Sequence, residues 1–287
     1  MKIAVHEGKF HADDVFAAAI LTLVFPKIKI IRTRDEEKLK SVDMRIDVGG
    51  KYDPKTGDFD HHQPTFKEKR SNGIPYASAG LIWKHFGDKL TSPEVKKDID
   101  ERIIQYIDAG DSGVDTFKSE IPIYTIADFI ASLNPSWPDI TNELFDKNFY
   151  SAVEIISNLL KREIRKAEET FKSESIILKK VKESKKDYIV LDSAIPWKET
   201  VTNHTKLKYV VRYSPVQDDW CVHAIPVSLN SFTNRKDLPK KWGGLSGKEL
   251  QEVTGVKDAI FCHKNLFLAV AKSKEGAIKL VELALKK

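Results

Sequence analysis

Short apolar runs alternate with helix-like segments over the first fifty residues of the chain. Strand-like runs occupy Lys2–His6, Lys29–Arg32 and Met44–Val48, and helix-like segments occupy Asp13–Val24 and Asp35–Lys40. Pro26 ends the first helical segment because proline cannot continue a helix. This alternation predicts a parallel sheet with helices on its faces, in which ligands gather at the carboxyl ends of the strands.

Further helices are predicted in the middle of the chain. Tyr76–Phe86 and Pro93–Ile107 look helical, and Ser92 is placed as an N-cap before a proline in the first helical turn. From Asn142 to Lys172, apolar residues recur at helical spacing with charges between them. We interpret this last segment as one long amphipathic helix that connects two domains.

The second half of the chain reads as a separate α/β unit. Strands are predicted at Tyr188–Leu191, Tyr209–Tyr213, Cys221–Val227, Ala259–Cys262 and Phe267–Ala271, and helices at Ser246–Val253 and from Lys274 onward. The predicted fold class is α/β, with an N-terminal parallel sheet flanked by helices, a second, smaller α/β domain, and a cleft between the two domains. The predicted divisions are residues 1–140, a connecting helix at 141–174, and residues 175–287.

Composition indicates a soluble globular protein. The chain has 287 residues, of which 41% are hydrophobic and 31% charged. No apolar stretch reaches the ~18 residues of a membrane span, and the start of the chain has no apolar signal core, so a cytoplasmic location is expected. Cys221 and Cys262 do not form a CxxC pair, which argues against a zinc ribbon or a disulfide framework.

The net positive charge of the chain is small, but one segment carries much of it. The formal net charge is +5, from 47 Lys and Arg against 42 Asp and Glu. The segment Lys161–Lys186 contains ten Lys or Arg and five Glu, and so carries as much net charge as the whole chain. This segment fits a solvated helix face, and it also fits a surface for a polyanion.

Histidines and carboxylates cluster near the predicted strand ends. Four of the eight histidines, His6, His11, His61 and His62, lie in the first 62 residues. His6, His11 and Asp13 lie between a strand end and a helix start, and imidazole with carboxylate suits Mn, Fe or Zn. Taken alone, Asp13 or Asp14 fits a helix N-cap equally well.

Three more clusters occur at the ends of predicted elements: Asp47 before Gly49 and Gly50, the run Asp60-His61-His62, and the pair Asp108 and Asp111 around Gly110. The cluster at Asp47 also fits a simple turn, and the pair Asp108 and Asp111 also fits the C-terminal end of a helix. Two adjacent histidines after an acid are costly to bury unless something binds them. Together the clusters favour two cations about 3.5–4 Å apart that share a bridging carboxylate.

The order of these motifs resembles that of the DHH phosphoesterase superfamily. Within it, the chain is similar to the metal-dependent protein hydrolase family, which includes the melanocyte proliferating gene product, a 3′–5′ RNA exonuclease. The resemblance covers nearly the full length. It is carried by HEGKFHADDVFAAAIL, DVGGKYDP, FDHHQ, GIPYASAGLIW, RKDLPKKWGGLSGKEL and IFCHKNLFLAVAKSKEGA.

The resemblance implies a role for each cluster. One metal is expected on His6, His11 and Asp47, and the other on Asp13, Asp47, His61 and Asp108, with Asp111 as the alternative to Asp108. Asp60 is expected to orient His61, and His62 to contact the scissile phosphate or protonate the leaving oxygen. The first motif departs from the usual His-x3-Asp-x-Asp, because His11 takes the place of the middle acid.

In this superfamily the second domain grips the substrate. The candidates here are Arg212, Arg235, Lys236 and His263. Arg235 and Lys236 fit an ordinary surface loop about as well as a nucleic-acid contact, and His263 also fits a core histidine.

The predicted function is that of a divalent-metal-dependent phosphodiesterase, a 3′–5′ exonuclease that acts on RNA or short oligonucleotides by two-metal activation of water. Mn is the expected metal, with Mg, Fe or Zn as alternatives. A small-molecule phosphoesterase stays open, and so does a non-catalytic RNA- or protein-binding module with structural metals. A homo-oligomer paired through the long helix also stays open.

Overall fold

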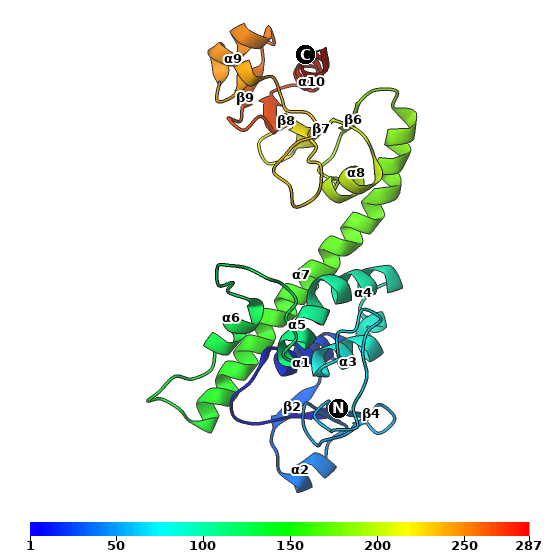
Figure 1. Cartoon of the computed structure of the whole chain (residues 1–287), viewed down its shortest axis with the longest axis vertical. Coiled ribbons are helices and arrows are strands. Elements are labelled where there is room, and N and C mark those ends of the chain that lie inside the picture. Colours follow the sequence, from blue (N-terminus) through cyan, green and yellow to red (C-terminus); the bar gives the residue numbers. More distant parts are fainter. Residues whose placement is uncertain (287) are drawn as a thin grey trace. The chain divides into compact units, whose positions relative to one another are not determined.

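The computed structural model describes residues 1–286 and divides into two compact units, Met1–Ala167 and Glu168–Lys287. Figure 1 shows helix α7 (Asn142–Glu183) running from one unit into the other. Among the residues described, no helix is both long and apolar enough to cross a membrane. Both units combine a sheet with helices, which confirms the predicted α/β class.

The first unit contains a five-stranded sheet in the order β2-β1-β3-β5-β4. Its strands are β1 (Lys2–Val5), β2 (Lys29–Arg32), β3 (Met44–Ile46), β4 (Tyr52–Asp53) and β5 (Asp58–Phe59). The first three match the predicted strands, and β1 pairs in parallel with both β2 and β3. β5 extends the parallel part beside β3, and β4 pairs with it antiparallel at the edge.

The helices of the first unit are α1 (Ala12–Val24), α2 (Glu36–Lys40), α3 (Ser78–Phe86), α4 (Pro93–Ile99), α5 (Gln105–Asp111) and α6 (Ile126–Ser132). The predicted helix Pro93–Ile107 is in fact α4, a π-helical segment at Asp100–Ile104, and α5. Ser92 caps α4 as expected, since its side chain accepts a hydrogen bond from the backbone N–H of Val95.

Helix α1 lies in the centre of the first unit's core. Every residue from Ala12 to Leu21 is buried, and the helix packs against α3 and α5. A run of alanines lets these neighbours approach closely and favours the helix by propensity. Because the helix is buried on all sides, the two carboxylates in its first turn, Asp13 and Asp14, are buried with it.

Helix α7 is longer than the sequence pattern suggested. Phe149, Ile156 and Leu160 pack into the core of the first unit, and Ile177 belongs to a core cluster of the second. The helix ends at Glu183 rather than at Lys172. Its apolar spacing continues through Ile177, beyond the predicted end.

The second unit has a five-stranded sheet in the order β6-β7-β8-β10-β9. Its strands are β6 (Tyr188–Leu191), β7 (Tyr209–Ser214), β8 (Asp219–Ala224), β9 (Ala259–Cys262) and β10 (Leu268–Ala271), and its helices after α7 are α8 (Lys198–His204), α9 (Gly247–Thr254) and α10 (Lys274–Lys286). Only β6 and β7 pair in parallel, and the other neighbours pair antiparallel. All five strands were predicted, whereas α8 was not.

Candidate metal centre

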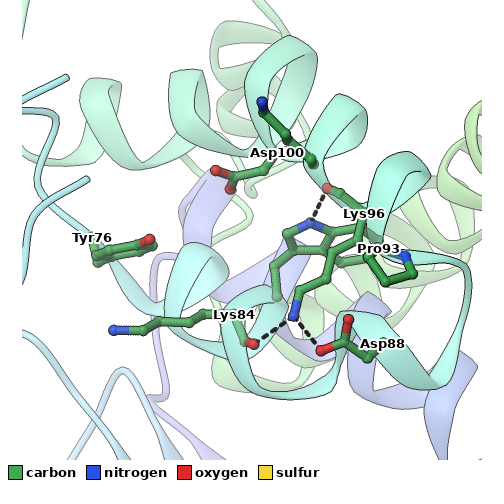
Figure 2. A pocket seen from close by; sticks show the side chains of 8 residues that line it. Tyr76, Lys84, Asp88, Pro93, Lys96 and Asp100 are labelled. Carbon is green, nitrogen blue, oxygen red and sulfur yellow. Dashed lines mark hydrogen bonds and ion pairs between the residues drawn. The ribbon is translucent and has the colours of Figure 1, made fainter. Parts of the chain in front are cut away.

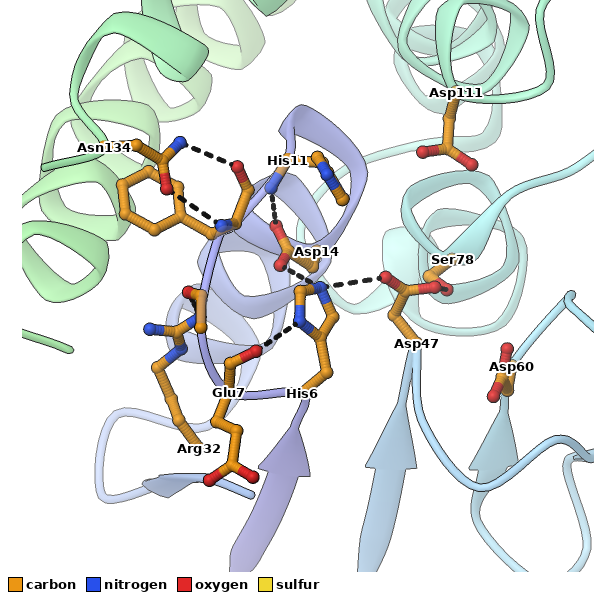
Figure 3. Close-up of polar contacts among 12 residues, drawn as sticks. His6, Glu7, His11, Asp14, Arg32, Asp47, Asp60, Ser78, Asp111 and Asn134 are labelled. Atoms are coloured by element: carbon orange, nitrogen blue, oxygen red, sulfur yellow. Dashed lines mark hydrogen bonds and ion pairs between the residues drawn. The ribbon is translucent and has the colours of Figure 1, made fainter. Parts of the chain in front are cut away.

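The carboxyl ends of three neighbouring strands carry the predicted ligands. His6 follows β1, Asp47 follows β3, and Asp60 follows β5. These strands are adjacent in the sheet and run in parallel, so their ends meet at one edge. Figure 3 shows His6, Asp47 and Asp60 side by side there, with the first turn of α1 above them.

His6 is held between two carboxylates. Its Nε2 lies 2.8 Å from Oδ2 of Asp14 and 3.4 Å from Oδ2 of Asp47. Burial alone lowers the pKa of His6, but the hydrogen bonds to Asp14 and Asp47 raise it to about 10. In the absence of a cation, a proton on His6 therefore balances part of the negative charge at this edge.

Asp47 has an uncommon backbone conformation and faces several imidazoles. Its φ is +55°, a left-handed value that costs roughly 1–2 kcal/mol for a residue other than glycine. Oδ2 faces His6, while Oδ1 lies 3.4 Å from Nδ1 of His62 and 3.8 Å from Nδ1 of His61. Burial raises the pKa of Asp47, but the imidazoles of His6 and His61 lower it below its usual value. The two oxygens thus face different histidines, so this carboxylate could contact two cations at once.

Asp13 is a fully buried carboxylate without a donor. Its exposed fraction is 0%, and within residues 1–286 neither of its oxygens accepts a hydrogen bond. Burial, together with the charges of Asp47 and Asp111, raises the pKa of Asp13 well above its usual value. Buried carboxylates are paired, neutralised or bound to metal, because an isolated charge is costly in a low-dielectric interior. The donor set around Asp13 therefore fits a cation.

Three groups of side chains bring their ligand atoms within 4.8 Å of one another: His6, His11 and Asp47; Asp47, His61 and His62; and His11, Asp13 and Asp111. Asp47 belongs to two of the groups, and so does His11. Nitrogen and carboxylate donors in this mixture suit Mn, Fe or Zn. Shared residues between adjacent groups fit a pair of cations better than a single one.

The structure brings Asp111, and not Asp108, to these groups. Asp108 is fully buried, with Oδ2 2.7 Å from Nη1 of Arg70 and Oδ1 accepting a hydrogen bond of 2.9 Å from the backbone N–H of Gly80. In contrast, Oδ2 of Asp111 lies 3.0 Å from Nε2 of His61. Asp108 holds α5 to α3, and Asp111, one turn later, faces the candidate ligands.

Asp60 contacts a different histidine from the one expected. Its Oδ1 lies 2.8 Å from Nδ1 of His62 and accepts a hydrogen bond from the backbone N–H of His62, while Oδ2 accepts one from Gly50. The prediction that Asp60 orients His61 is therefore corrected to His62. The side chain of His62 is 61% exposed, and its ring stacks on that of His61 with centroids 4.3 Å apart. A fixed but accessible imidazole results.

Two residues at the site were not identified from the sequence. Asp14 follows the first histidine cluster in sequence, but no ligand role is predicted for it. The N-cap of α1 is His11 rather than Asp13 or Asp14; Asp14 accepts the backbone N–H of His11, and its second oxygen contacts His6. Ser78 is buried at the start of α3 and donates a hydrogen bond of 3.2 Å to Oδ1 of Asp47. Two acids at the start of an otherwise apolar helix were a usable signal for Asp14, whereas nothing distinguished Ser78.

The loop between His6 and His11 is fixed from outside. Arg32 donates a hydrogen bond of 2.6 Å to the carbonyl of Gly8 and pairs with Asp146 at 3.0 Å. The side-chain amide of Asn134 exchanges two hydrogen bonds with the backbone of Phe10. Figure 3 shows both anchors beside the loop. They hold the histidines in place without contacting them.

The four predicted substrate contacts lie in the second unit and differ in how they are engaged. Arg235 donates to the carbonyls of Leu207 and Thr202, and Lys236 donates to the carbonyl of Leu285. Arg212 donates from Nε to the ring of His223, and His263 accepts the backbone N–H of Asn265. Arg235 and Lys236 thus bind backbone carbonyls of their own unit.

A small hollow between α3 and α4 has a different character. It has a volume of about 310 Å³ and is lined by Tyr76, Lys84, Lys96 and Asp100 among others (Figure 2). Lys96 is already bound to Asp88 and to the carbonyl of Lys84. None of the residues that line this hollow belongs to the three groups of ligand atoms found in the described part of the chain.

Comparison with known proteins supplies a family. The sequence model of the MYG1 exonuclease family, described as an uncharacterised protein family (UPF0160), matches residues 2–285. Mouse MYG1 exonuclease is 30% identical over 99% of this chain and 84% of its own length. The MYG1 protein of Dictyostelium discoideum is 30% identical over 97% of this chain and 94% of its own length. The MYG1 protein of Chlamydia muridarum is 31% identical over 99% of this chain and 96% of its own length.

One solved structure aligns along most of both chains. It is the pGpG-specific phosphodiesterase PggH of Vibrio cholerae, with 15% sequence identity, a TM-score of 0.33, and coverage of 99% of this chain and 97% of that one. A likeness at this TM-score carries no argument about the site.

Proposed function

The chain belongs to the MYG1 exonuclease family, and from that premise we propose that it is a divalent-metal-dependent phosphodiesterase. The proposed reaction is 3′–5′ exonucleolytic cleavage of RNA or short oligonucleotides. Support for the metal dependence comes from the first unit alone, and the family supports the class of reaction.

The observation that carries the proposal is the buried carboxylate of Asp13. It has no donor among the described residues and lies with His11 and Asp111 in one group of ligand atoms. Asp47 joins the two neighbouring groups. A protein interior does not keep such a set of acids uncompensated, and a pair of divalent cations is the compensation that its nitrogen and oxygen donors fit.

We propose that one cation is held by His6, His11 and Asp47, and a second by Asp13, Asp47, His61 and Asp111. Such a pair supplies a Lewis acid for the phosphoryl oxygens and lowers the pKa of bound water. Mn is the proposed metal, and Mg, Fe and Zn are alternatives.

The chain's own residues supply positioning and a proton path. Ser78 fixes Oδ1 of Asp47 by hydrogen bonding, and the left-handed backbone of Asp47 aims its carboxylate across the strand ends. Asp60 holds His62 through Nδ1, which leaves Nε2 of this exposed ring available to donate a proton to the leaving oxygen.

In the second unit, Arg212 and His263 remain proposed substrate contacts. Arg235 and Lys236 are assigned a structural role instead, because their side chains donate to backbone carbonyls distant in sequence, whereas Arg212 donates to His223 and to the carbonyl of the adjacent Tyr213. This division separates residues that affect substrate affinity from residues that affect only folding.

The test combines metal binding with cleavage. Purified protein is titrated with Mn²⁺ by calorimetry and then incubated with end-labelled RNA. We expect about two Mn²⁺ per chain and stepwise loss of nucleotides from the 3′ end. His62→Ala is expected to lower kcat by about 100-fold or more while both ions still bind. The control is His204→Ala, which removes an exposed histidine that lies in the second unit and not in the first.

Two results contradict the proposal. Failure to cleave RNA, DNA or a chromogenic phosphodiester with any of several divalent metals argues for a binding module with structural metals. Full activity in His62→Ala removes the proposed proton donor but leaves the metal site standing.

A further inference from the structure

A pocket within the first unit is lined in part by α5, the helix that also carries Asp111. It has a volume of about 680 Å³, in the usual range for small-molecule sites. Its walls come from α5, α6, α7 and the segment that joins α5 to α6, and they include Tyr106, Ile107, Phe117, Ile126 and Leu159. The pocket is therefore mostly apolar, with two aromatic rings.

The pocket and the metal centre share the last turn of α5. Gly110 and Gly113 line the pocket, and between them lies Asp111, whose carboxylate is 3.0 Å from His61. A Cβ added to Gly110 meets no atom within 4 Å, so this end of the pocket is open space. A ligand held near Asp111 would meet no side chain of residue 110 on the way to the pocket.

The charges of the pocket select against a second phosphate. Arg102 is its one arginine, and the guanidinium is bound to Asp98 at 2.8 Å and to Glu163 at 3.1 Å. Glu163 and Asp115 also line the pocket. Because the positive charge is already neutralised, an anion gains nothing here, while an uncharged ring does.

The aromatic side chains are exposed in the way that a stacking surface requires. Tyr106 is 47% exposed and Phe117 is 53% exposed. Thr116 adds a hydroxyl group to the apolar wall. A nucleobase has an apolar face for stacking and a polar edge for hydrogen bonds, and it is tethered to a phosphate by a single sugar.

We infer that this pocket receives one nucleobase of the substrate while the adjoining phosphate lies at the metal centre. This inference rests on the proposed function and deepens it. It assigns Tyr106 and Phe117 to base stacking and Gly110 to the passage between phosphate and base.

The experiment compares ligands with and without a base. Full-length protein loaded with Ca²⁺, to slow turnover, is titrated by calorimetry with adenosine 5′-monophosphate and with ribose 5-phosphate. We expect the nucleotide to bind about tenfold more tightly or better, because stacking adds to phosphate binding. Phe117→Ala and Gly110→Leu are each expected to bring nucleotide affinity close to that of ribose 5-phosphate, which itself stays unchanged.

The variants have matched controls. Trp137→Ala removes another exposed aromatic ring of the first unit, 86% exposed, from outside the pocket lining, and is expected to leave the tenfold preference intact. Metal titrations and thermal unfolding of Gly110→Leu check that the neighbouring ligands and the fold are retained.

The outcomes separate this inference from the function beneath it. Equal affinity for both ligands, or a preference that survives both pocket variants, overturns the base pocket but leaves the phosphodiesterase intact. Failure of both ligands to bind metal-loaded protein overturns the proposed function as well. A dimer by light scattering that Phe117→Ala converts to a monomer shows that a second copy occupies the pocket, and this also overturns the inference.

Discussion

The strand ends of the first unit and the cationic residues of the second unit show two different uses of charged side chains. Asp13, in the first turn of α1 above the strand ends, is buried and has no hydrogen-bond donor among residues 1–286, and Asp47, after β3, faces several imidazoles. In the second unit, the donors of Arg235 and Lys236 reach backbone carbonyls. The charged groups at the strand ends lack part of their hydrogen-bond partners among the described residues, whereas Arg235 and Lys236 have theirs.

The difference teaches how to separate a site from a scaffold. A satisfied charge stabilises the fold, and its loss is felt as loss of stability. A buried charge without a partner destabilises the fold until a ligand binds to it. Removing such a charge should therefore weaken ligand affinity rather than lower the free energy of unfolding. Variants in the two regions should therefore divide into those that change metal affinity and those that change the free energy of unfolding.

The largest effect is expected for Asp47→Asn. Asparagine tolerates the left-handed backbone, so the fold should persist, but one anionic ligand shared by two groups is lost. Activity should fall by about 1,000-fold or more, with Mn²⁺ affinity falling alongside. The matched control is Asp218→Asn, an exposed aspartate of the second unit with a φ of +52°. Similar kinetics for both variants contradict a bridging role.

A smaller effect is expected for Asp13→Asn, which keeps the shape and removes the charge. Metal binding to the native state raises its stability, by about 2.7 kcal/mol at a free concentration of 100 times Kd. Wild-type protein should therefore melt at a lower temperature after chelation, and Asp13→Asn should lose most of that difference. The control Asp100→Asn removes an acid that pairs with Arg70, away from the ligand groups. An unchanged chelator response in Asp13→Asn argues against a ligand at this position.

The pH dependence of metal binding sharpens the comparison further. Hydrogen bonds to Asp14 and Asp47 overcome the effect of burial and raise the pKa of His6 to about 10. Protonated His6 therefore stabilises the metal-free fold fully below its unfolded pKa of about 6.5, and this contribution is lost as pH rises towards 10. A cation must displace that proton, so Mn²⁺ affinity should rise with pH across this range.

Calorimetry in buffers of different ionisation enthalpy measures the proton directly. At pH 7.5, His6 should release about one proton when the metal binds. His6→Gln is expected to remove that release, whereas His204→Gln is expected to keep it. Affinity that is independent of pH between 6.5 and 9 contradicts protonation of His6 in the metal-free protein.

The sequence predicted the fold best where the pattern was long and regular. Alternating strands and helices gave the parallel part of the first sheet, and all five strands of the second unit were predicted. The two-residue strands β4 and β5 are too short to show a period, and the helix after Pro93 contains a π-helical segment that periodicity does not reveal. Helix α8 was missed because seven residues with few apolar positions give a weak signal.

At the site, the sequence identified most of the side chains but not their partners. His6, His11, Asp13, Asp47 and His61 do come together, because parallel strands end at one edge. The sequence alone does not distinguish Asp108 from Asp111. In the structure, Asp108 contacts Arg70 and Gly80 and therefore points away from the other candidate ligands. The same limit applies to Arg235, whose carbonyl partners are distant in sequence.

The smallest effect on catalysis is expected for Arg235→Ala, and it tests the other side of the comparison. The variant leaves two carbonyls, those of Leu207 and Thr202, without their donor, which should lower the free energy of unfolding by about 1–3 kcal/mol. The KM for RNA and Mn²⁺ affinity should stay within about twofold of wild type. Arg212→Ala should raise the KM for RNA clearly, and it should also lower the free energy of unfolding, because the ring of His223 and the carbonyl of Tyr213 lose their donor. If Arg235→Ala raises KM without loss of stability, the carbonyl contacts do not describe its role, and satisfied charges in the second unit also serve the substrate.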